Sequence, residues 1–332
     1  MKVNRKFLRS AERLSLSAIA KDSATQKIVS AVTAIGFVMQ PVAALASTIT
    51  RENALDKNLA TGAVTNIFAE NVVGNVAINK FKDFRLDANN IANMYFGKNE
   101  TSNVDNLVNF VGSRIDINGT VNAIQNKKIG GNLFFFSPDG MAVGKTGVIN
   151  AGALYVATPT KSAFNDYKKL DKEAGFNKII NDEGFAQIPI NASGTISVLG
   201  KVNAVNAVNM RAAKIGVGKN VSKDNIGDVA AGATATGASI RTGDIDFTNL
   251  VNIKNKGADV DAGLAKNLKA TKDGSGNIVL AAYNNYDDNY SMLDDFREIA
   301  GAKVEAELTV AQGAEVKAAG KAKLSAQALN NV

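Results

Sequence analysis

The stretch "NLFFFSPDGMAVGKTGVINAGALYVAT", residues 132–158, decides the fold. An aromatic run, Phe134 to Phe136, comes directly before the turn sequence Ser137-Pro138-Asp139-Gly140, and two alternating apolar stretches follow. Glycine and proline mark turns, and period-2 alternation of apolar and polar residues predicts a strand with one buried face. We therefore expect this stretch to form one complete turn of a coil of short strands.

The same pattern recurs along the chain. "SRIDINGTVNAI" (113–124), "GTISVLGKVNAVNAV" (194–208) and the alternating run 302–329 repeat it, and the turn sequences 118–121, 146–149, 193–196 and 199–202 each place a glycine before an aliphatic residue. Such self-similarity without helical connectors predicts stacked coils. Glycine and asparagine suit the corners because both tolerate positive φ.

A β-sandwich is the alternative fold, because it also alternates. The residues predicted to point inward are mostly Val, Ile, Ala and Leu, and aromatic residues make up only 6% of the chain. Small aliphatic side chains stack well inside a narrow coil, which favours an all-β parallel β-helix. The segment Thr48–Leu86 is predicted to cap its N-terminal end, since an uncovered strand edge invites aggregation.

Three segments do not fit the coil and are predicted to leave it. Residues 161–185 are rich in Lys, Asp and Glu and predict a partly helical excursion. Residues 284–302 predict an acidic excursion with a short helix over Ser291–Ile299. Residues 98–112 predict a short amphipathic turn, from the spacing of Asp105, Leu107, Val108 and Val111.

The first 46 residues resemble a secretion signal. A basic start precedes the apolar stretch Ile28–Met39 and the small-residue cleavage pattern Ala44-Leu45-Ala46, so cleavage is predicted before Ser47. The apolar stretch is too short for a stable membrane anchor. The alternative is a short buried helix at the start of a cytosolic domain.

Composition excludes several function classes. The chain has 332 residues, a formal net charge of +7, and no cysteine or histidine, which removes thiol nucleophiles, Ser-His-Asp triads and the usual zinc sites. Residues 1–46 hold seven of the 38 basic and two of the 31 acidic residues. The other 31 basic and 29 acidic residues leave a net charge of +2, so nucleic-acid binding is not expected.

Three segments in this order carry a family resemblance: "NKFKDFRLD" (79–87), "VNFVGSRIDINGTVNA" (108–123) and 130–158. They resemble the secretion domains of two-partner-secreted exoproteins of the filamentous-haemagglutinin type, and the branch of fusobacterial leukotoxin-like adhesins in particular. The resemblance covers about Asn53 to Ile215. Asn79, Phe81 and Phe84 match the family's Asn-x-Phe-x-x-Phe element, and its Asn-Pro-Asn-Gly turn falls on Ser137, Pro138, Asp139 and Gly140.

The resemblance implies a right-handed parallel β-helix with N-terminal capping strands and small extra-helical excursions. It divides the chain into a signal peptide (1–46), a secretion domain (47–215) and a continuing β-helix (216–332). It also implies a partner, an outer-membrane β-barrel transporter with periplasmic peptide-binding domains, reached through the general secretion machinery. Ser137 and Asp139 replace both asparagines of the family's turn, although both can cap a turn through side-chain oxygens.

The predicted function is to direct a large adhesin or toxin to this transporter, so the protein is expected at the cell surface or outside the cell, where the full-length protein would meet host cells. We expect no catalytic activity, cofactor or metal site. The residues predicted to matter for recognition are Asn79, Phe81, Phe84 and the turn 137–140. A β-helical carbohydrate-active enzyme and a passive host-binding rod remain alternatives, and a solvated loop is favoured over a calcium site for the acidic cluster Asp287, Asp288, Asp294, Asp295 and Glu298.

Overall fold

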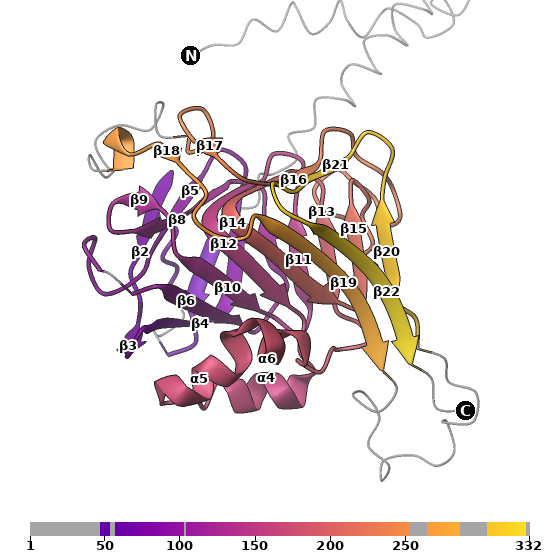
Figure 1. Cartoon of the computed structure of the whole chain (residues 1–332), viewed down its shortest axis with the longest axis horizontal. Helices are drawn as coiled ribbons and strands as arrows, with labels where there is room; N and C mark the ends of the chain where they lie inside the picture. The colour runs from indigo at the N-terminus through magenta and orange to yellow at the C-terminus, as the bar shows by residue number, and fades with distance from the viewer. Residues whose placement is uncertain (1–46, 54–56, 103, 253–263, 286–303, 330–332) are drawn as a thin grey trace, which may run out of the picture. The chain divides into compact units, whose positions relative to one another are not determined.

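The computed structural model describes residues 47–53, 57–102, 104–252, 264–285 and 304–329. Within residues 46–332, which form one compact unit, short strands wind into a coil and stack in parallel (Figure 1). The expected all-β parallel β-helix is confirmed, and a sandwich of antiparallel sheets is excluded by the pairing. Residues 1–46 lie outside the described residues.

Three parallel ladders make up the three sides of the coil. Ladder A stacks β4 (Val76–Leu86), β6 (Asn106–Val111), β10 (Asn132–Phe136), the second half of β12 (Val148–Ala157), the second half of β14 (Lys201–Ala212), β19 (Asn277–Asn285) and β22 (Ala322–Leu329). Ladder B stacks the end of β4, β7 (Ile115–Ile117), β11 (Gly140–Val143), β13 (Thr195–Val198), β15 (Lys214–Val217) and β20 (Glu307–Val310). Ladder C stacks β2 (Val64–Ile67), β5 (Ile91–Tyr95), β8 (Thr120–Gln125), the first halves of β12 and β14, β16 (Ser239–Thr242) and β21 (Glu315–Lys317).

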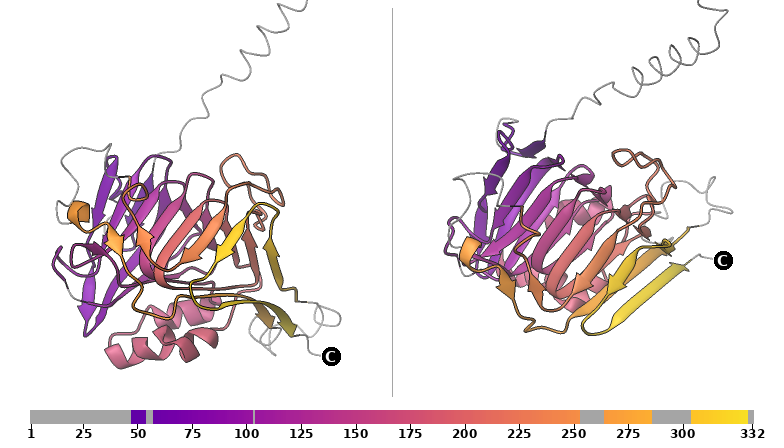
Figure 2. Two further views of the ribbon diagram at one scale, coloured as in Figure 1. Left: turned by 45° about the horizontal axis from the view of Figure 1, so that its top comes forward. Right: turned by 90° about the horizontal axis from the view of Figure 1, so that it is seen from above.

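One strand from each ladder makes one rung of the coil, and Figure 2 shows the rungs stacked in chain order. Rung 1 is β4 and β5, rung 2 is β6 to β8, and rung 3 is β10, β11 and the first half of β12. Rung 4 runs from the second half of β12 through β13 to the first half of β14. Rung 5 runs from the second half of β14 through β15 to β16, and rung 6 is β19 to β21.

The N-terminal end is covered by antiparallel strands. β1 (Thr48–Arg51) and β3 (Asn71–Val73) both pair with β4 in the antiparallel sense. β4 itself pairs in parallel with β6, so it belongs to rung 1 and not to the cap. Two further antiparallel pairs lie outside the ladders: β8 with β9 (Lys128–Ile129), and β17 (Ile245–Asp246) with β18 (Lys269–Ala270).

Aliphatic side chains of equal register fill the coil in columns. On ladder A, Ala77, Leu107, Leu133, Leu154, Val208 and Ile278 occupy successive rungs and are all buried. Burial of apolar surface stabilises a fold by about 25 cal/mol for each Å² removed from water, so these columns are the main stabilising contribution. Ile115, Ile117, Val121 and Ala123, apolar residues of the alternating stretch 113–124, are buried in the same core.

Glycine is needed at the predicted corners for a different physical reason from the expected one, which was a positive φ. Gly119, Gly147 and Gly200 are not among the glycines with a positive φ. A Cβ on Gly147 would lie 2.2 Å from the carbonyl oxygen of Ile117, and one on Gly200 would lie 2.2 Å from the carbonyl oxygen of Gly147. These corners therefore need glycine because successive rungs stack too closely for a side chain.

The aromatic run of β10 is buried on both of its faces. Phe135 points into the coil, whereas Phe134 and Phe136 point outward and pack against a helical excursion. That excursion consists of α4 (Lys161–Tyr167), α5 (Glu173–Ile180) and α6 (Asp182–Ala186), which lie against ladder A in Figures 1 and 2. The predicted partly helical excursion at 161–185 is therefore confirmed.

Two other predicted excursions have different outcomes. The amphipathic turn at 98–112 is wrong, because residues 106–111 form β6. Leu107 and Val111 point into the coil and Val108 packs beneath the helices, so a strand buried on both faces produced the apolar spacing. The helix expected over Ser291–Ile299 lies outside the described residues. The ladders continue across position 215, which falls within β15.

Candidate functional site

Asn79 is a buried link between the cap and the second rung. It lies on β4 with its side chain inside the coil and no exposed surface. Its Oδ1 accepts a hydrogen bond from the backbone N–H of Glu70 at 3.1 Å, and its Nδ2 donates to Oδ1 of Asn109 at 3.0 Å. A buried amide costs free energy unless it is hydrogen-bonded, so this satisfied pair fixes the register of rungs 1 and 2.

Phe81 and Phe84 are core residues of the first rung. Both have 0% exposed surface, and their ring centroids lie 5.4 Å apart in an edge-to-face arrangement. Phe84 also meets Phe135 of the third rung at 5.7 Å. The antiparallel strand β1 covers them, with Ile49 paired to Phe84. A partner can therefore touch these two rings only before β4 joins the coil.

A chain of hydrogen bonds joins the three segments that carry the family resemblance. Asn79, of the first segment, donates to Asn109 of the second, and Asn109 Nδ2 donates to the carbonyl oxygen of Phe134 in the third at 3.0 Å. Asn109 has 0% exposed surface, so this chain runs through the dry interior of rungs 1 to 3. The structure thus brings together residues that are far apart in the sequence.

The turn Ser137-Pro138-Asp139-Gly140 is the corner between ladders A and B in rung 3. Ser137 is buried, and its Oγ donates to the carbonyl oxygen of Ser113 at 2.7 Å in the rung before. On the other side, Asn191 Nδ2 donates to the carbonyl oxygen of Pro138 at 3.0 Å. The turn is therefore held from both neighbouring rungs.

Gly140 and Asp139 have opposite environments within this turn. Gly140 has φ +94°, and a Cβ there would lie 1.8 Å from the carbonyl oxygen of Thr195, so no other residue fits. Asp139 is exposed, and among the predicted recognition residues it is the one whose side chain reaches the surface. The turn therefore presents one carboxylate on a rigid corner.

Asp139 lies on a charged groove of about 500 Å³ along this corner. Arg85 and Arg114 line the groove together with Asp83 and Asp116. The Arg114 Nε lies 2.8 Å from Oδ1 of Asp116, and its Nη1 lies 3.3 Å from Oδ2 of Asp224. The groove therefore carries charges of both signs, several of which are already paired.

Ser47, the predicted first residue after cleavage, is part of the folded unit. It is buried, and its Oγ accepts hydrogen bonds from the backbone N–H of Asp87 at 2.9 Å and from Nδ2 of Asn90 at 2.8 Å. Burial raises the pKa of Asp87, and the nearby Arg85 guanidinium partly offsets the rise. Ala44 and Ala46, the other predicted cleavage residues, lie outside the described residues.

An outward-facing asparagine column on ladder C was missed by the sequence reasoning. Asn66 on β2 is followed by Asn93, Asn122, Asn150 and Asn203 on rungs 1 to 4, and the Nδ2 of each of these four donates to the Oδ1 of the asparagine before it at 2.9–3.0 Å. A sequence signal existed, because an aliphatic-Asn-Ala triad recurs at 121–123, 149–151 and 202–204. We call this column the amide ladder.

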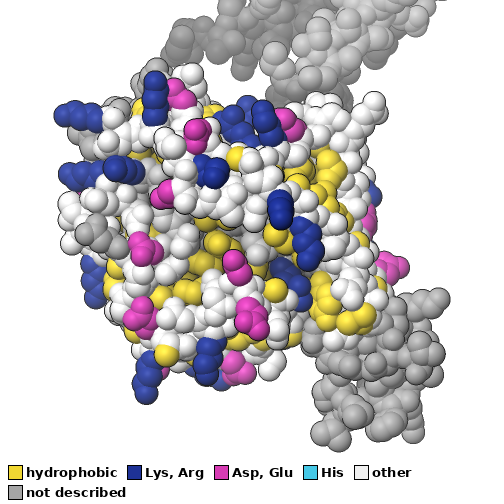
Figure 3. All heavy atoms as spheres, viewed as in Figure 1, with side chains coloured by type: hydrophobic (Ala, Val, Ile, Leu, Met, Phe, Trp, Pro, Cys, Tyr) yellow, Lys and Arg dark blue, Asp and Glu magenta, His cyan; other side chains and the backbone are white. Residues whose placement is uncertain are grey.

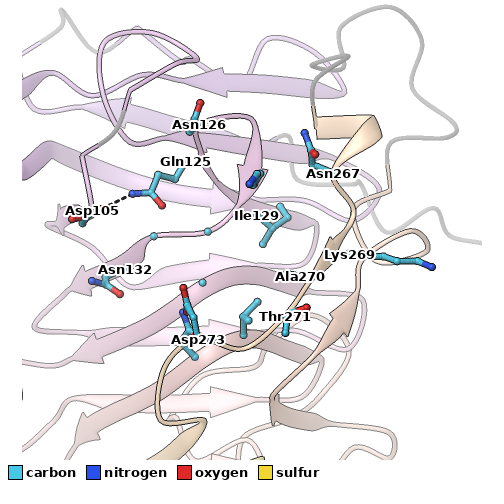
Figure 4. A pocket seen from close by; sticks show the side chains of 16 residues that line it. Asp105, Gln125, Asn126, Ile129, Asn132, Asn267, Lys269, Ala270, Thr271 and Asp273 are labelled. Carbon is cyan, nitrogen blue, oxygen red and sulfur yellow. Dashed lines mark hydrogen bonds between the residues drawn. The ribbon is translucent and has the colours of Figure 1, made fainter.

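A second groove, of about 620 Å³, lies where the coil turns from ladder C to ladder A (Figure 4). Asp105 and Gln125 line one side and Asp273 lies on the other. Both oxygens of Asp105 accept hydrogen bonds, Oδ1 from Gln125 Nε2 and Oδ2 from Asn75 Nδ2, each at 2.8 Å. That carboxylate therefore fastens the corner through both of its oxygens.

Neither a cluster of metal ligands nor a membrane-spanning helix occurs among the described residues. No group of three or more carboxylates within the described ranges is placed to hold a metal ion, and the acidic cluster 287–298 lies outside them. No helix in the described part of the chain is long and apolar enough to span a bilayer. On the face seen in Figure 3, Lys and Arg side chains alternate with Asp and Glu.

Comparison with known proteins identifies no relative: no family model, no curated protein and no solved structure matches this chain. Assignment of a function therefore depends on the geometry described above and on the motif resemblance.

Proposed function

We propose that this chain is a secretion-targeting domain, which delivers an exoprotein to an outer-membrane barrel transporter and nucleates its folding at the cell surface. The observation that carries the proposal is the hydrogen-bond chain Asn79–Asn109–Phe134. It joins the three resembling segments into rungs 1 to 3, beneath the antiparallel cap. A capped set of first rungs is what a coil needs in order to grow in one direction.

Burial decides when recognition would take place. Asn79, Phe81 and Phe84 have 0% exposed surface in the folded coil. If the transporter reads these residues, it does so on an extended chain, before β4 acquires its partners. Addition of an extended segment to the edge of a sheet in a periplasmic domain is a known mode of peptide recognition and fits this state of the chain.

Composition and fold are consistent with passage through a pore. The chain has no cysteine, so no disulfide formed in an oxidising compartment would close a loop before threading. Each emerging rung pairs with the previous one at a strand spacing of about 4.8 Å, so folding outside the pore can proceed rung by rung. Folding on the far side would hold the chain there without a supply of ATP.

Charge reversal at the exposed corner tests the proposal. The variant Asp139→Arg is expected to keep the fold, because the Asp139 side chain is exposed while Ser137 and Gly140 hold the corner. We expect export to fall at least about tenfold, because the turn is the centre of the resemblance. The ratio of medium to cell-associated protein measures export, and circular dichroism of the purified variant checks the fold.

Asp171→Arg is the matched control, since Asp171 is also exposed but lies between α4 and α5, away from the turn. It makes the same change of charge and is expected to leave export unchanged. Normal export of Asp139→Arg, or an equal loss in both variants, would contradict the assigned role of the turn. Ser137→Arg is a poorer test, because Ser137 is buried and its loss would damage the coil directly.

A carbohydrate-active enzyme and a passive rod that binds host cells are the other functions considered. A glycosidase needs two carboxylates facing each other across a groove. In the second groove, both oxygens of Asp105 are engaged by neighbouring amides, which favours a structural role for that residue. No observation favours either alternative over export.

A further inference from the structure

Residues 243–252 and 264–273, which we call the strap, leave the coil after rung 5 and return across its first rungs. They contain β17, β18 and the short 3₁₀ helix η3 (Leu264–Lys266). In Figures 1 and 2 the orange β17 and β18 lie beside the purple β5 and β8, which precede them by more than a hundred positions. The strap therefore joins the latest part of rung 5 to rungs 1 to 3.

Hydrogen bonds connect the strap to the amide ladder. Asn150 Nδ2 donates to the carbonyl oxygen of Leu250 at 3.0 Å, and Asn122 Nδ2 donates to that of Val251 at 3.4 Å. Asn252 Nδ2 donates to Oγ1 of Thr120 at 2.8 Å. Asn122 and Asn150 thus each use one N–H on the previous rung and the other on the strap.

The strap also seals the ladder from water. Phe247, Val251 and Leu264 pack with Tyr95 of β5, Ile124 of β8 and Ile129 of β9 in one buried apolar cluster. Under this cover Asn93, Asn122 and Asn150 have 0% exposed surface. Hydrogen bonds in a dry, polarisable column strengthen one another, so the ladder depends on the strap and the strap on the ladder.

Such a contact is unusual for a stacked coil. Rungs of a repeat protein touch only their neighbours, so a coil can fray from either end one rung at a time. The strap instead ties rung 1 to the segment that follows rung 5. Release of rung 1 then requires the strap to lift from the whole ladder.

We propose that the strap is a latch. Rungs 1 to 5 form without it, and it closes over the amide ladder once residues 243–252 and 264–273 are available. Closure changes a stack that frays rung by rung into a block that opens as one unit. This inference concerns folding alone and does not depend on the proposed function.

Native-state hydrogen exchange on the full chain, read by mass spectrometry, tests the latch with the variant Phe247→Ala. Phe247 has 0% exposed surface, and truncating such a side chain is expected to raise the opening rate of rungs 1 to 3 more than about tenfold. The informative peptide is β6, because its buried side chains pack in other apolar clusters than those of the strap. Faster exchange in β6 as well as in β8 supports a block that opens together.

Two further variants keep the test decisive. Asn252→Gly removes the bond to Thr120 while glycine retains the φ of +57°, so it gives a milder, several-fold effect in a chain that still folds. Val229→Ala truncates a residue in the cover of ladder B and is expected to raise exchange only at its neighbours Ala142 and Leu199. Faster exchange confined to 120–125 and 148–151 in the strap variants, or no change, would overturn the latch.

Discussion

Asparagine side chains join successive rungs in two separate places. Inside the coil, Asn79 and Asn109 link the cap, the second rung and the carbonyl oxygen of Phe134. Outside it, the amide ladder runs beneath the strap. An amide carries both a donor and an acceptor, so one residue type can bond to the rung before and the rung after it. This double capacity sets the register of the stack.

Tyr155 gives the chain a pH dependence in alkaline solution. Burial raises its pKa to about 12, and the nearby Asp182 carboxylate adds to the rise. Because the pKa of an unfolded tyrosine is about 10, the stabilising contribution is complete below pH 10 and is lost as the pH rises through about 12. Between about pH 10 and 12 the free energy of unfolding of the wild type is expected to fall by an amount on the order of 2 kcal/mol because of Tyr155. The variant Tyr155→Phe has no phenol to ionise and is expected to lack this decrease.

Urea denaturation at neutral pH and at about pH 11.5 measures this difference. At neutral pH the two chains are expected to have similar stability, because phenylalanine keeps the ring contacts with Phe134 and Phe185. An equal alkaline loss of stability in both chains would show that Tyr155 does not cause it.

The helical excursion α4 to α6 acts as a cover for ladder A. Its Phe185 lies 6.3 Å from Phe134, 6.2 Å from Phe136 and 5.4 Å from Tyr155, measured between ring centroids. Without the helices, the outward rings of β10 would form an exposed apolar patch. Exposed patches of that kind favour aggregation.

Truncation of this contact tests the cover. Phe185 has 0% exposed surface, so Phe185→Ala is expected to lower the free energy of unfolding by about 3–5 kcal/mol. Phe185→Leu, which keeps an apolar side chain, is expected to cost about 1 kcal/mol. Urea denaturation compares the three chains. A stability of Phe185→Ala equal to that of the wild type would mean that the helices do not stabilise the coil.

Period-2 alternation predicted the coil well where one face of a strand is buried and the other is polar. It failed at 106–111, because Val108 and Phe110 are buried beneath the helices as well as Leu107 and Val111 within the coil. A strand buried on both faces loses its alternation and imitates the spacing of a helix. A strand that is covered by an excursion is therefore not recognised from the local pattern of apolar and polar residues.

The candidate site was predictable only in part, for a related reason. Asn79 and the turn at Ser137 could be named from local motifs, but Asn109 acquires its role through partners on the rungs before and after it. The strap is even harder to predict from the sequence, because its hydrogen bonds to Thr120, Lys127 and Asn150 join residues 100 to 140 positions apart. No local window of sequence contains both members of such a pair.

At the scale of the molecule, each ladder has its own cover. Helices α4 to α6 lie on ladder A, residues around Ile226 and Val229 pack on ladder B, and the strap packs on ladder C. The N-terminal rungs are thus enclosed on three sides and capped by β1 and β3. At the C-terminal end of the described coil, the apolar column residues Val310 of β20 and Leu324 of β22 are 40% and 42% exposed. This asymmetry suits a coil that starts at its N-terminal end.

Export through a dedicated transporter is the central claim, and the amount of chain in the culture medium tests it most directly. The chain is expressed in a Gram-negative host that carries a gene for an outer-membrane transporter of the two-partner type, and in the same host without that gene. Folded chain beginning at Ser47 is expected in the medium only when the transporter is present. Equal amounts of chain in the medium of both strains would contradict the account.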